Sequence, residues 1–212
     1  MNKFGFIGFG DLGKQINNHF IAKEQLPENQ IYFFDDNLHK RGAKNAFRFH
    51  DYLLEEHKDL SFINCLGYKH LMLKNAIINQ LLDAKRTIQG FNHPSCFISS
   101  DCTIMDGSII YPLCAIDFGV VVGFGVLLNN SVTISHDCTI GSCTYLAPGV
   151  VISGKVTIGE NCFVGAGSII TDHITIGSNV TIGVGTVVTK NIPDNTCVIG
   201  NPMKVVNQLV LR

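Results

Sequence analysis

Two short groups of residues in this 212-residue sequence are suited to chemistry. The first is His136, which Asp137 follows directly. An imidazole is the side chain best matched to accept a proton at neutral pH, and a neighbouring carboxylate can fix which ring nitrogen carries the proton. The second is the run Gly8-x-Gly10-x-x-Gly13, with Asp35 further along the chain. That spacing is typical of a loop that holds phosphate groups at the start of a helix.

A six-residue repeat in the second half of the chain must position His136. Every sixth residue from Ile98 to Val188 is Ile, Leu or Val, which makes sixteen positions. Three such faces make a coil of eighteen residues, and the pattern is typical of a parallel β-helix of about five coils. The positions two residues earlier are small or β-branched. Five of the eight cysteines lie there, and we interpret them as small core residues: Cys96, Cys102, Cys114, Cys138 and Cys162.

Residues 1–90 follow a different pattern, in which strands alternate with helices. Strands are predicted at 3–7, 31–34 and 60–66. Helices are predicted from the glycine run to about residue 24, around 50–58 and from about 70 to 82. This alternation predicts a compact parallel α/β unit. We therefore expect two domains, an α/β unit over residues 1–90 and a β-helix over residues 91–212, with Pro94 interrupting any strand ladder between them.

Composition narrows the classes of function. Sixteen Lys and Arg residues balance seventeen Asp and Glu residues, so the net charge is -1 and no nucleic-acid or anionic-membrane surface is expected. Apolar residues make up 46% of the chain and the mean hydropathy is +0.23, which argues against disorder. No apolar run approaches the roughly 20 residues that span a bilayer, and no signal-peptide pattern is present, so a cytoplasmic protein is expected. A chain of this length without a signal-peptide pattern is not expected to be a disulfide scaffold, and the lack of a Cys-x-x-Cys pair argues against a zinc knuckle.

The whole chain resembles the family of sugar-nucleotide amino-group N-acetyltransferases and related sialic acid O-acetyltransferases. Its members join a Rossmann-like domain to a left-handed hexapeptide β-helix, and the expected handedness comes from this resemblance. The segment 128–141, in which His136 follows Asn129 by seven positions, resembles the family's active-site coil. The segments 188–193 and 198–202 resemble its closing coil. The chain departs from the pattern at Leu12, where some members carry a histidine that contacts the acceptor, and at Asp11, where glycine is more usual.

The resemblance implies an enzyme that transfers acetyl from acetyl-CoA to the 4-amino group of a TDP-, UDP- or GDP-linked amino-deoxy sugar. It further implies a homotrimer with active sites between neighbouring β-helices, and a role in bacterial surface-polysaccharide synthesis. On this interpretation His136 is the general base, Asp137 orients it, and the backbone N–H of Gly154 meets the oxyanion. The implied substrate contacts are Gly10, Asp11, Leu12, Asp35, Asp36, Gly67 and Asn129. The implied coenzyme A contacts are Tyr145, Ala166, Val184 and Lys190.

Other functions remain open at this point. O-acetylation of sialic acid would use the same base. A metalloenzyme such as a γ-type carbonic anhydrase needs convergent histidines, but His93, His136 and His173 are separated by 43 and 37 residues, neither a multiple of eighteen, so no metal is expected. An NAD-dependent oxidoreductase would leave the β-helix without a catalytic purpose. Purely structural roles also remain: glycines that serve a tight turn, an exposed histidine without function, and a non-catalytic trimeric scaffold.

Overall fold

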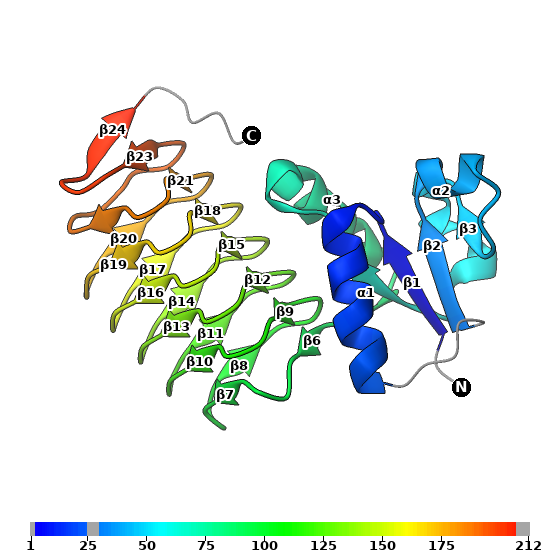
Figure 1. The fold of residues 1–212 in the computed structure, drawn as a ribbon, viewed down its shortest axis with the longest axis horizontal. Coiled ribbons are helices and arrows are strands. Elements are labelled where there is room, and N and C mark those ends of the chain that lie inside the picture. Colours follow the sequence, from blue (N-terminus) through cyan, green and yellow to red (C-terminus); the bar gives the residue numbers. More distant parts are fainter. Residues whose placement is uncertain (1–2, 25–29, 207–212) are drawn as a thin grey trace. The chain divides into compact units, whose positions relative to one another are not determined.

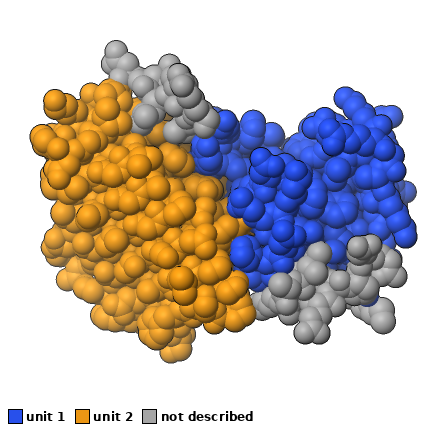
Figure 2. Space-filling model, viewed as in Figure 1, with its two compact units in different colours: residues 1–91 blue, residues 92–212 orange. Residues whose placement is uncertain are grey.

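The structure, a computed structural model, describes residues 3–24 and 30–206. The chain divides into two compact units, residues 1–91 and residues 92–212 (Figure 2). Within the described ranges, no helix is both long enough and apolar enough to cross a membrane.

Unit 1 contains a parallel five-stranded sheet in the order β3-β2-β1-β4-β5 (Figure 1). Its strands are β1 (Lys3–Ile7), β2 (Ile31–Phe34), β3 (Ala46–Phe47), β4 (Leu60–Asn64) and β5 (Thr87–Ile88). Its helices are α1 (Asp11–Glu24), α2 (Asp36–Lys40) and α3 (Leu71–Asp83), with short 3₁₀ helices η2 (Phe49–Leu53), η3 (Glu55–His57) and η4 (Tyr68–His70). Because β1 and β4 are parallel neighbours, the segments that follow them lie at the same edge of the sheet.

Two sequence predictions in unit 1 need correction. The helix predicted around 50–58 is instead η2 and η3, because Leu54 between them is extended, with φ -60° and ψ 146°. The strand predicted to run to residue 66 ends at Asn64, whose side-chain Oδ1 accepts a hydrogen bond from the Leu66 N–H at 3.2 Å. This Asx-type turn diverts the backbone from the ladder. Helix α2 was not predicted, since its N-cap residue Asp35 was interpreted only as a ligand contact.

Unit 2 consists of three parallel sheets of two-residue strands, stacked coil upon coil (Figure 1). One sheet holds β7 (Phe97–Ile98), β10 (Ala115–Ile116), β13 (Thr133–Ile134), β16 (Val151–Ile152), β19 (Ile169–Ile170) and β22 (Val187–Val188). The second holds β8 (Thr103–Ile104), β11 (Val121–Val122), β14 (Thr139–Ile140), β17 (Thr157–Ile158) and β20 (Thr175–Ile176). The third holds β6 (Phe91–Asn92), β9 (Ile109–Ile110), β12 (Leu127–Leu128), β15 (Tyr145–Leu146), β18 (Phe163–Val164), β21 (Thr181–Ile182), β23 (Cys197–Ile199) and the antiparallel β24 (Lys204–Val206).

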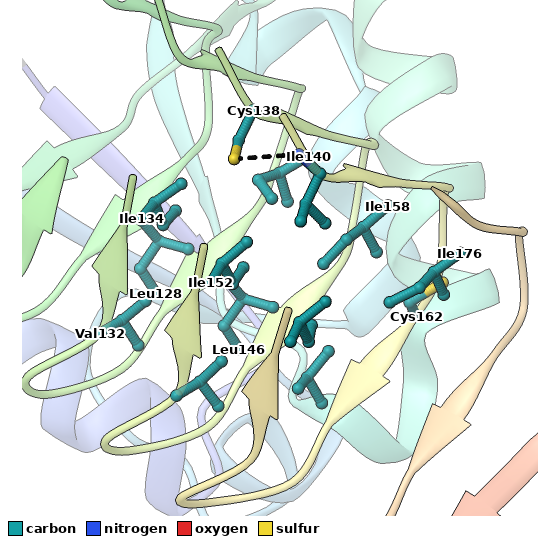
Figure 3. Close-up of a cluster of buried hydrophobic side chains, with 14 of the residues drawn as sticks. Leu128, Val132, Ile134, Cys138, Ile140, Leu146, Ile152, Ile158, Cys162 and Ile176 are labelled. Atoms are coloured by element: carbon teal, nitrogen blue, oxygen red, sulfur yellow. Dashed lines mark hydrogen bonds between the residues drawn. The ribbon is translucent and has the colours of Figure 1, made fainter. Parts of the chain in front are cut away.

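The register of these sheets confirms the parallel β-helix with its coil of eighteen residues. Ile134, for example, pairs with Ile116 on one side and with Ile152 on the other. Side chains such as Leu128, Ile134 and Ile152 lie in the interior of the coils (Figure 3), and each is at most 1% exposed. Burial of this continuous aliphatic column drives the stacking, because no single coil can cover its own apolar face.

The five cysteines of the repeat also act as hydrogen-bond donors, so their interpretation as small apolar fillers was incomplete. Cys138 Sγ donates to the carbonyl oxygen of Ser153 at 3.1 Å, and Cys162 Sγ donates to that of Gly177 at 3.1 Å. Ser168, at an equivalent position, donates from its hydroxyl to the carbonyl fifteen residues later at 2.9 Å. Cys96, Cys102 and Cys114 repeat the pattern. The thiols therefore occupy a ladder of donors in which hydroxyl and thiol groups are interchangeable.

This ladder predicts how Cys162 responds to substitution. Burial raises the pKa of the Cys162 thiol to about 11, so the group keeps its proton at neutral pH. Cys162→Ser keeps a donor and is expected to unfold near the wild-type denaturant midpoint. Cys162→Ala leaves the Gly177 carbonyl without this donor and is expected to lose about 1–2 kcal/mol of unfolding free energy in urea titrations. Equal losses in the two variants would contradict a donor role.

Candidate functional site

His136 lies in the turn between β13 and β14, two residues after the inward Ile134. Its side chain is 40% exposed, and its Nδ1 lies 2.9 Å from Asp137 Oδ2. Asp137 adopts a left-handed backbone conformation with φ 57°, which turns the chain at this corner of the coil. An ionised carboxylate only accepts hydrogen bonds, so Nδ1 donates to Asp137. Nε2 of the neutral ring is then left with a lone pair that can accept a proton.

Residues eighteen positions away on either side form the walls around this ring. The Phe118 ring stacks against His136 with the centroids 5.3 Å apart and an interplanar angle of 11°. On the opposite side lies Gly154, where an added Cβ would stand 2.6 Å from His136 Nε2. Only glycine therefore leaves room for the ring in this position. Within the described residues, no hydrogen bond uses the Gly154 N–H.

Asn129 and Tyr145 are joined to each other within the coils. Asn129 Nδ2 donates to the Tyr145 hydroxyl at 2.8 Å, and Asn129 Oδ1 accepts from the Asn130 N–H at 2.8 Å. The Tyr145 ring is buried and stacks on Phe163, with centroids 5.7 Å apart. One amide hydrogen of Asn129 is left to donate.

The other residues expected to contact coenzyme A lie at the surface of unit 2. Ala166 and Val184 occupy the same corner of consecutive coils, and the neighbouring Gly185 N–H donates to the Ala166 carbonyl at 2.9 Å. Val184 is 74% exposed, and Lys190 is also exposed. The structure thus brings Ala166 and Val184 together, while Tyr145 lies in β15 and pairs with Phe163 of β18, the strand that precedes Ala166.

Unit 1 contains a cavity of about 330 Å³ at the edge of its sheet where β1 and β4 end. Of the predicted substrate contacts, the residues that line it are Gly10, Asp11, Leu12, Asp35 and Gly67. Asp36 does not line it; this residue lies in a separate hollow with His39, Lys40 and Arg48, and its Oδ1 accepts from the Phe49 N–H at 3.0 Å.

The three glycines of the loop have different explanations. Gly8 has φ 78°, and a Cβ there would lie 2.9 Å from Leu66. A Cβ at Gly13 would lie 2.7 Å from the Gly8 carbonyl oxygen. Local structure therefore accounts for both residues. At Gly10, in contrast, an added Cβ would meet no atom within 4 Å, so packing within the protein does not require glycine there.

Asp35 has a structural role that the sequence did not reveal. Its carboxylate accepts hydrogen bonds from the N–H groups of Phe9 at 2.9 Å, Asn37 at 2.9 Å and Leu38 at 3.1 Å. It therefore caps α2 and ties the glycine loop to the end of β2. A carboxylate has about four acceptor positions, so one is left for a ligand hydroxyl or N–H.

Several further residues line the cavity and were not predicted from the sequence, namely Phe49, Cys65, Leu66, Tyr68, Lys69 and His70. The signal that could have found most of them is the rule that ligands bind beyond the carboxyl ends of parallel strands, since residues 65–70 follow β4 directly. Burial raises the pKa of Cys65 to about 12, so its thiol is neutral and a poor nucleophile at physiological pH. No group of three His, Cys, Asp or Glu side chains in the described part of the chain is placed to hold a metal ion.

The fold has counterparts among known proteins. Residues 155–190 match the family model "Hexapeptide repeat of succinyl-transferase". The acetyltransferase domain of PglB from Neisseria gonorrhoeae FA1090 superposes with a TM-score of 0.85 at 26% identity, over 97% of this chain and 100% of that one. The same domain in complex with acetyl coenzyme A gives a TM-score of 0.84 at 27% identity, over the same shares of the two chains.

A second neighbour, PerB from Caulobacter crescentus in complex with CoA and GDP-perosamine, gives a TM-score of 0.86 at 22% identity over 98% of both chains. At 22% identity, this similarity shows that the two proteins share a fold and nothing more. No curated protein matches the sequence significantly.

The repeat and the coil register give stacked sheets that fit a left-handed β-helix, and the neighbouring structures support an acyltransferase. Within that class, the predicted resemblance to the amino-sugar N-acetyltransferases is confirmed.

Proposed function

We propose that this protein transfers the acetyl group of acetyl-CoA to the 4-amino group of a nucleotide-linked amino-deoxy sugar. The observation that carries the proposal is the arrangement of His136, whose Nδ1 is held by Asp137 while Nε2 faces the backbone of Gly154. Support for the donor comes from the PglB acetyltransferase domain, which is 27% identical over its whole length and binds acetyl coenzyme A.

The chemistry asked of His136 follows from the reaction. The sugar amine attacks the thioester carbonyl carbon, so that a C–N bond forms and the C–S bond then breaks. His136 Nε2 accepts the proton that the attacking amine loses, and Asp137 keeps Nδ1 protonated throughout. The Gly154 N–H, which makes no hydrogen bond within the described residues, donates to the developing oxyanion. Coenzyme A leaves as the thiol once the proton reaches its sulfur.

Unit 1 is proposed to be the Rossmann-like domain that binds the nucleotide. Its strand order, β3-β2-β1-β4-β5, supports this proposal because it matches the order of Rossmann-type sheets. In such sheets the phosphates lie at the turn after the first strand, which here is the glycine loop of the 330 Å³ cavity. Asp35 keeps one acceptor position for the nucleoside.

We also propose a homotrimer whose subunits meet along the β-helices, with coenzyme A bound near Ala166, Val184 and Lys190. Support comes from the outer face of the six-stranded sheet, where Phe97, Val151 and Ile169 are 66%, 38% and 43% exposed. Apolar side chains gathered on one face favour burial against a second copy. Light scattering coupled to size-exclusion chromatography tests this, and a mass of one chain in solution would contradict it.

Release of free thiol from acetyl-CoA tests the proposed reaction directly. The acceptors are TDP-, UDP- and GDP-linked 4-amino-4,6-dideoxy sugars, each compared with the matching 4-hydroxy sugar nucleotide and with free sialic acid. We expect turnover with a 4-amino sugar nucleotide. Transfer to sialic acid alone would replace the proposal by O-acetylation.

Gly10 supplies a prediction specific to the nucleotide site. A Cβ at Gly10 meets no protein atom, so Gly10→Ala is expected to unfold within about 1 kcal/mol of wild type. The same methyl group occupies space that a phosphate would need, and the KM for the sugar nucleotide is expected to rise about tenfold or more, by roughly 1.4 kcal/mol. Steady-state kinetics and urea titration measure both effects. An unchanged KM would place the phosphates elsewhere.

A further inference from the structure

The charges around the glycine-loop cavity need to be balanced if an anion binds there. The acidic residues that line the cavity are Asp11 and Asp35. Asp11 lies in the first turn of α1, and its Oδ1 is 3.4 Å from Lys14 Nζ, while Asp35 already accepts three backbone hydrogen bonds. Among the described lining residues, the only basic side chains are those of Lys69 and His70.

Lys69 and His70 come from η4, the short helix that follows β4. Because β1 and β4 pair in register from Lys3 and Leu60 onward, η4 and the glycine loop leave the sheet at the same edge. The two segments approach closely, since a Cβ on Gly67 would lie 3.5 Å from the Leu12 side chain. Lys69 and His70 therefore line the same cavity as the start of α1, and this part of its lining is named here the basic wall.

Among residues 3–24 and 30–206, neither side chain of the basic wall is engaged elsewhere. In the described part of the chain, Lys69 and His70 make no side-chain hydrogen bond or ion pair. His70 stands at the N-cap of α3 without making a side-chain capping bond. Both residues are exposed, so placing a cation there incurs no large desolvation cost. Their donors are thus available to a ligand in the cavity.

We propose that the basic wall binds the second phosphate of the nucleotide sugar and makes the enzyme selective for nucleoside diphosphate-linked acceptors. This inference rests on the proposed function. The backbone N–H groups at the start of α1 can hold one phosphate, but the Asp11 carboxylate beside them adds negative charge to that end of the site. A second phosphate therefore needs a cation from the other side. Lys69 supplies it as a charge-assisted donor, and His70 supplies an N–H donor in either protonation state.

Equilibrium binding to the full chain tests the proposal without requiring turnover. The probes are UDP, TDP and GDP, each paired with its monophosphate, measured by calorimetry at two salt concentrations. For Lys69→Met we expect the affinity for the bound diphosphate to fall about tenfold or more, and that for the monophosphate to fall less than threefold. Lys69→Arg should restore most of the loss. Lys85→Met is the matched control, because Lys85 is exposed and precedes β5, at the opposite edge of the sheet.

The possible results separate this inference from the proposed function. Equal losses of affinity in Lys69→Met and Lys85→Met would overturn the proposed role of the basic wall, even if acetyl transfer is found. Equal losses of affinity for the diphosphate and the monophosphate would do the same. The protein could also show a diphosphate selectivity that depends on Lys69 but acetylate none of the sugar nucleotides. That result would support the proposed role of the basic wall and overturn the proposed reaction. A wild-type chain that binds no nucleoside diphosphate would overturn both. In an active enzyme, Lys69→Met should raise the KM for the sugar nucleotide and leave kcat within about twofold.

Discussion

Replacing His136 with asparagine is expected to lower kcat for acetyl transfer by at least about 10²-fold, which is the usual contribution of a positioned general base. Asparagine keeps a polar side chain beside Phe118 and Asp137 but cannot accept the proton of the attacking amine. Because the expected loss lies in proton transfer, the KM values for both substrates should change little. Steady-state thiol release with a competent acceptor measures the effect.

The chain contains a matched control for this variant. His173 also has an acidic neighbour, with Nε2 3.8 Å from Asp172 Oδ2, and it occupies the corner position of Asp137 two coils later. Its side chain is 66% exposed, and among the described ring contacts no aromatic residue stacks on it. His173→Asn is therefore expected to keep wild-type kcat. Similar activity in both variants would mean that solvent or another residue takes the proton.

Gly154→Ala is expected to lower kcat by about 10²-fold, because a misplacement of the reacting groups by about 1 Å can cost that much. The new Cβ would stand 2.6 Å from His136 Nε2 and 2.8 Å from its Cε1, so the ring must leave its place against Phe118. The altered ring position should also move the His136 resonances in NMR spectra of the free protein.

Gly149→Ala separates this steric effect from a general loss of stability. Gly149 has φ 70°, so alanine there is strained by about 1–2 kcal/mol, yet its Cβ would meet no atom within 4 Å. We expect this control to unfold earlier in urea while retaining kcat. If Gly154→Ala retained full activity, the glycine could not be required for the position of the ring.

The β-helix was predictable because its information is local and repeated. Each aliphatic residue specifies the same inward position, and pairing eighteen residues apart follows once three faces close a coil. Unit 1 was harder, since Asp35 and Leu54 act through backbone geometry: the first caps α2, and the second separates two 3₁₀ helices. The spacing of apolar residues along the sequence indicates neither of these two effects.

The candidate sites divide in the same way. Phe118 and Gly154 could be located from His136 by adding or subtracting one coil, although the stacking and the missing Cβ became meaningful only with atomic positions. Lys69 and His70 lie 56 or more residues after the glycine run, and only the parallel pairing of β1 and β4 brings the two segments together. Spacing along the chain gives no indication of that pairing.

The eighteen-residue register has a consequence for how unit 2 assembles. Every rung from β7 to β22 contacts partners only one coil away, so each newly synthesised coil can dock on the preceding one without waiting for distant sequence. Because every coil has the same kind of interior, a register slip by one whole coil would change few of the aliphatic contacts inside the β-helix. It would, however, place His136 opposite residues other than Phe118 and Gly154. Growth from a fixed first rung would keep His136 in register with Phe118 and Gly154, which the repeated aliphatic interior does not specify by itself.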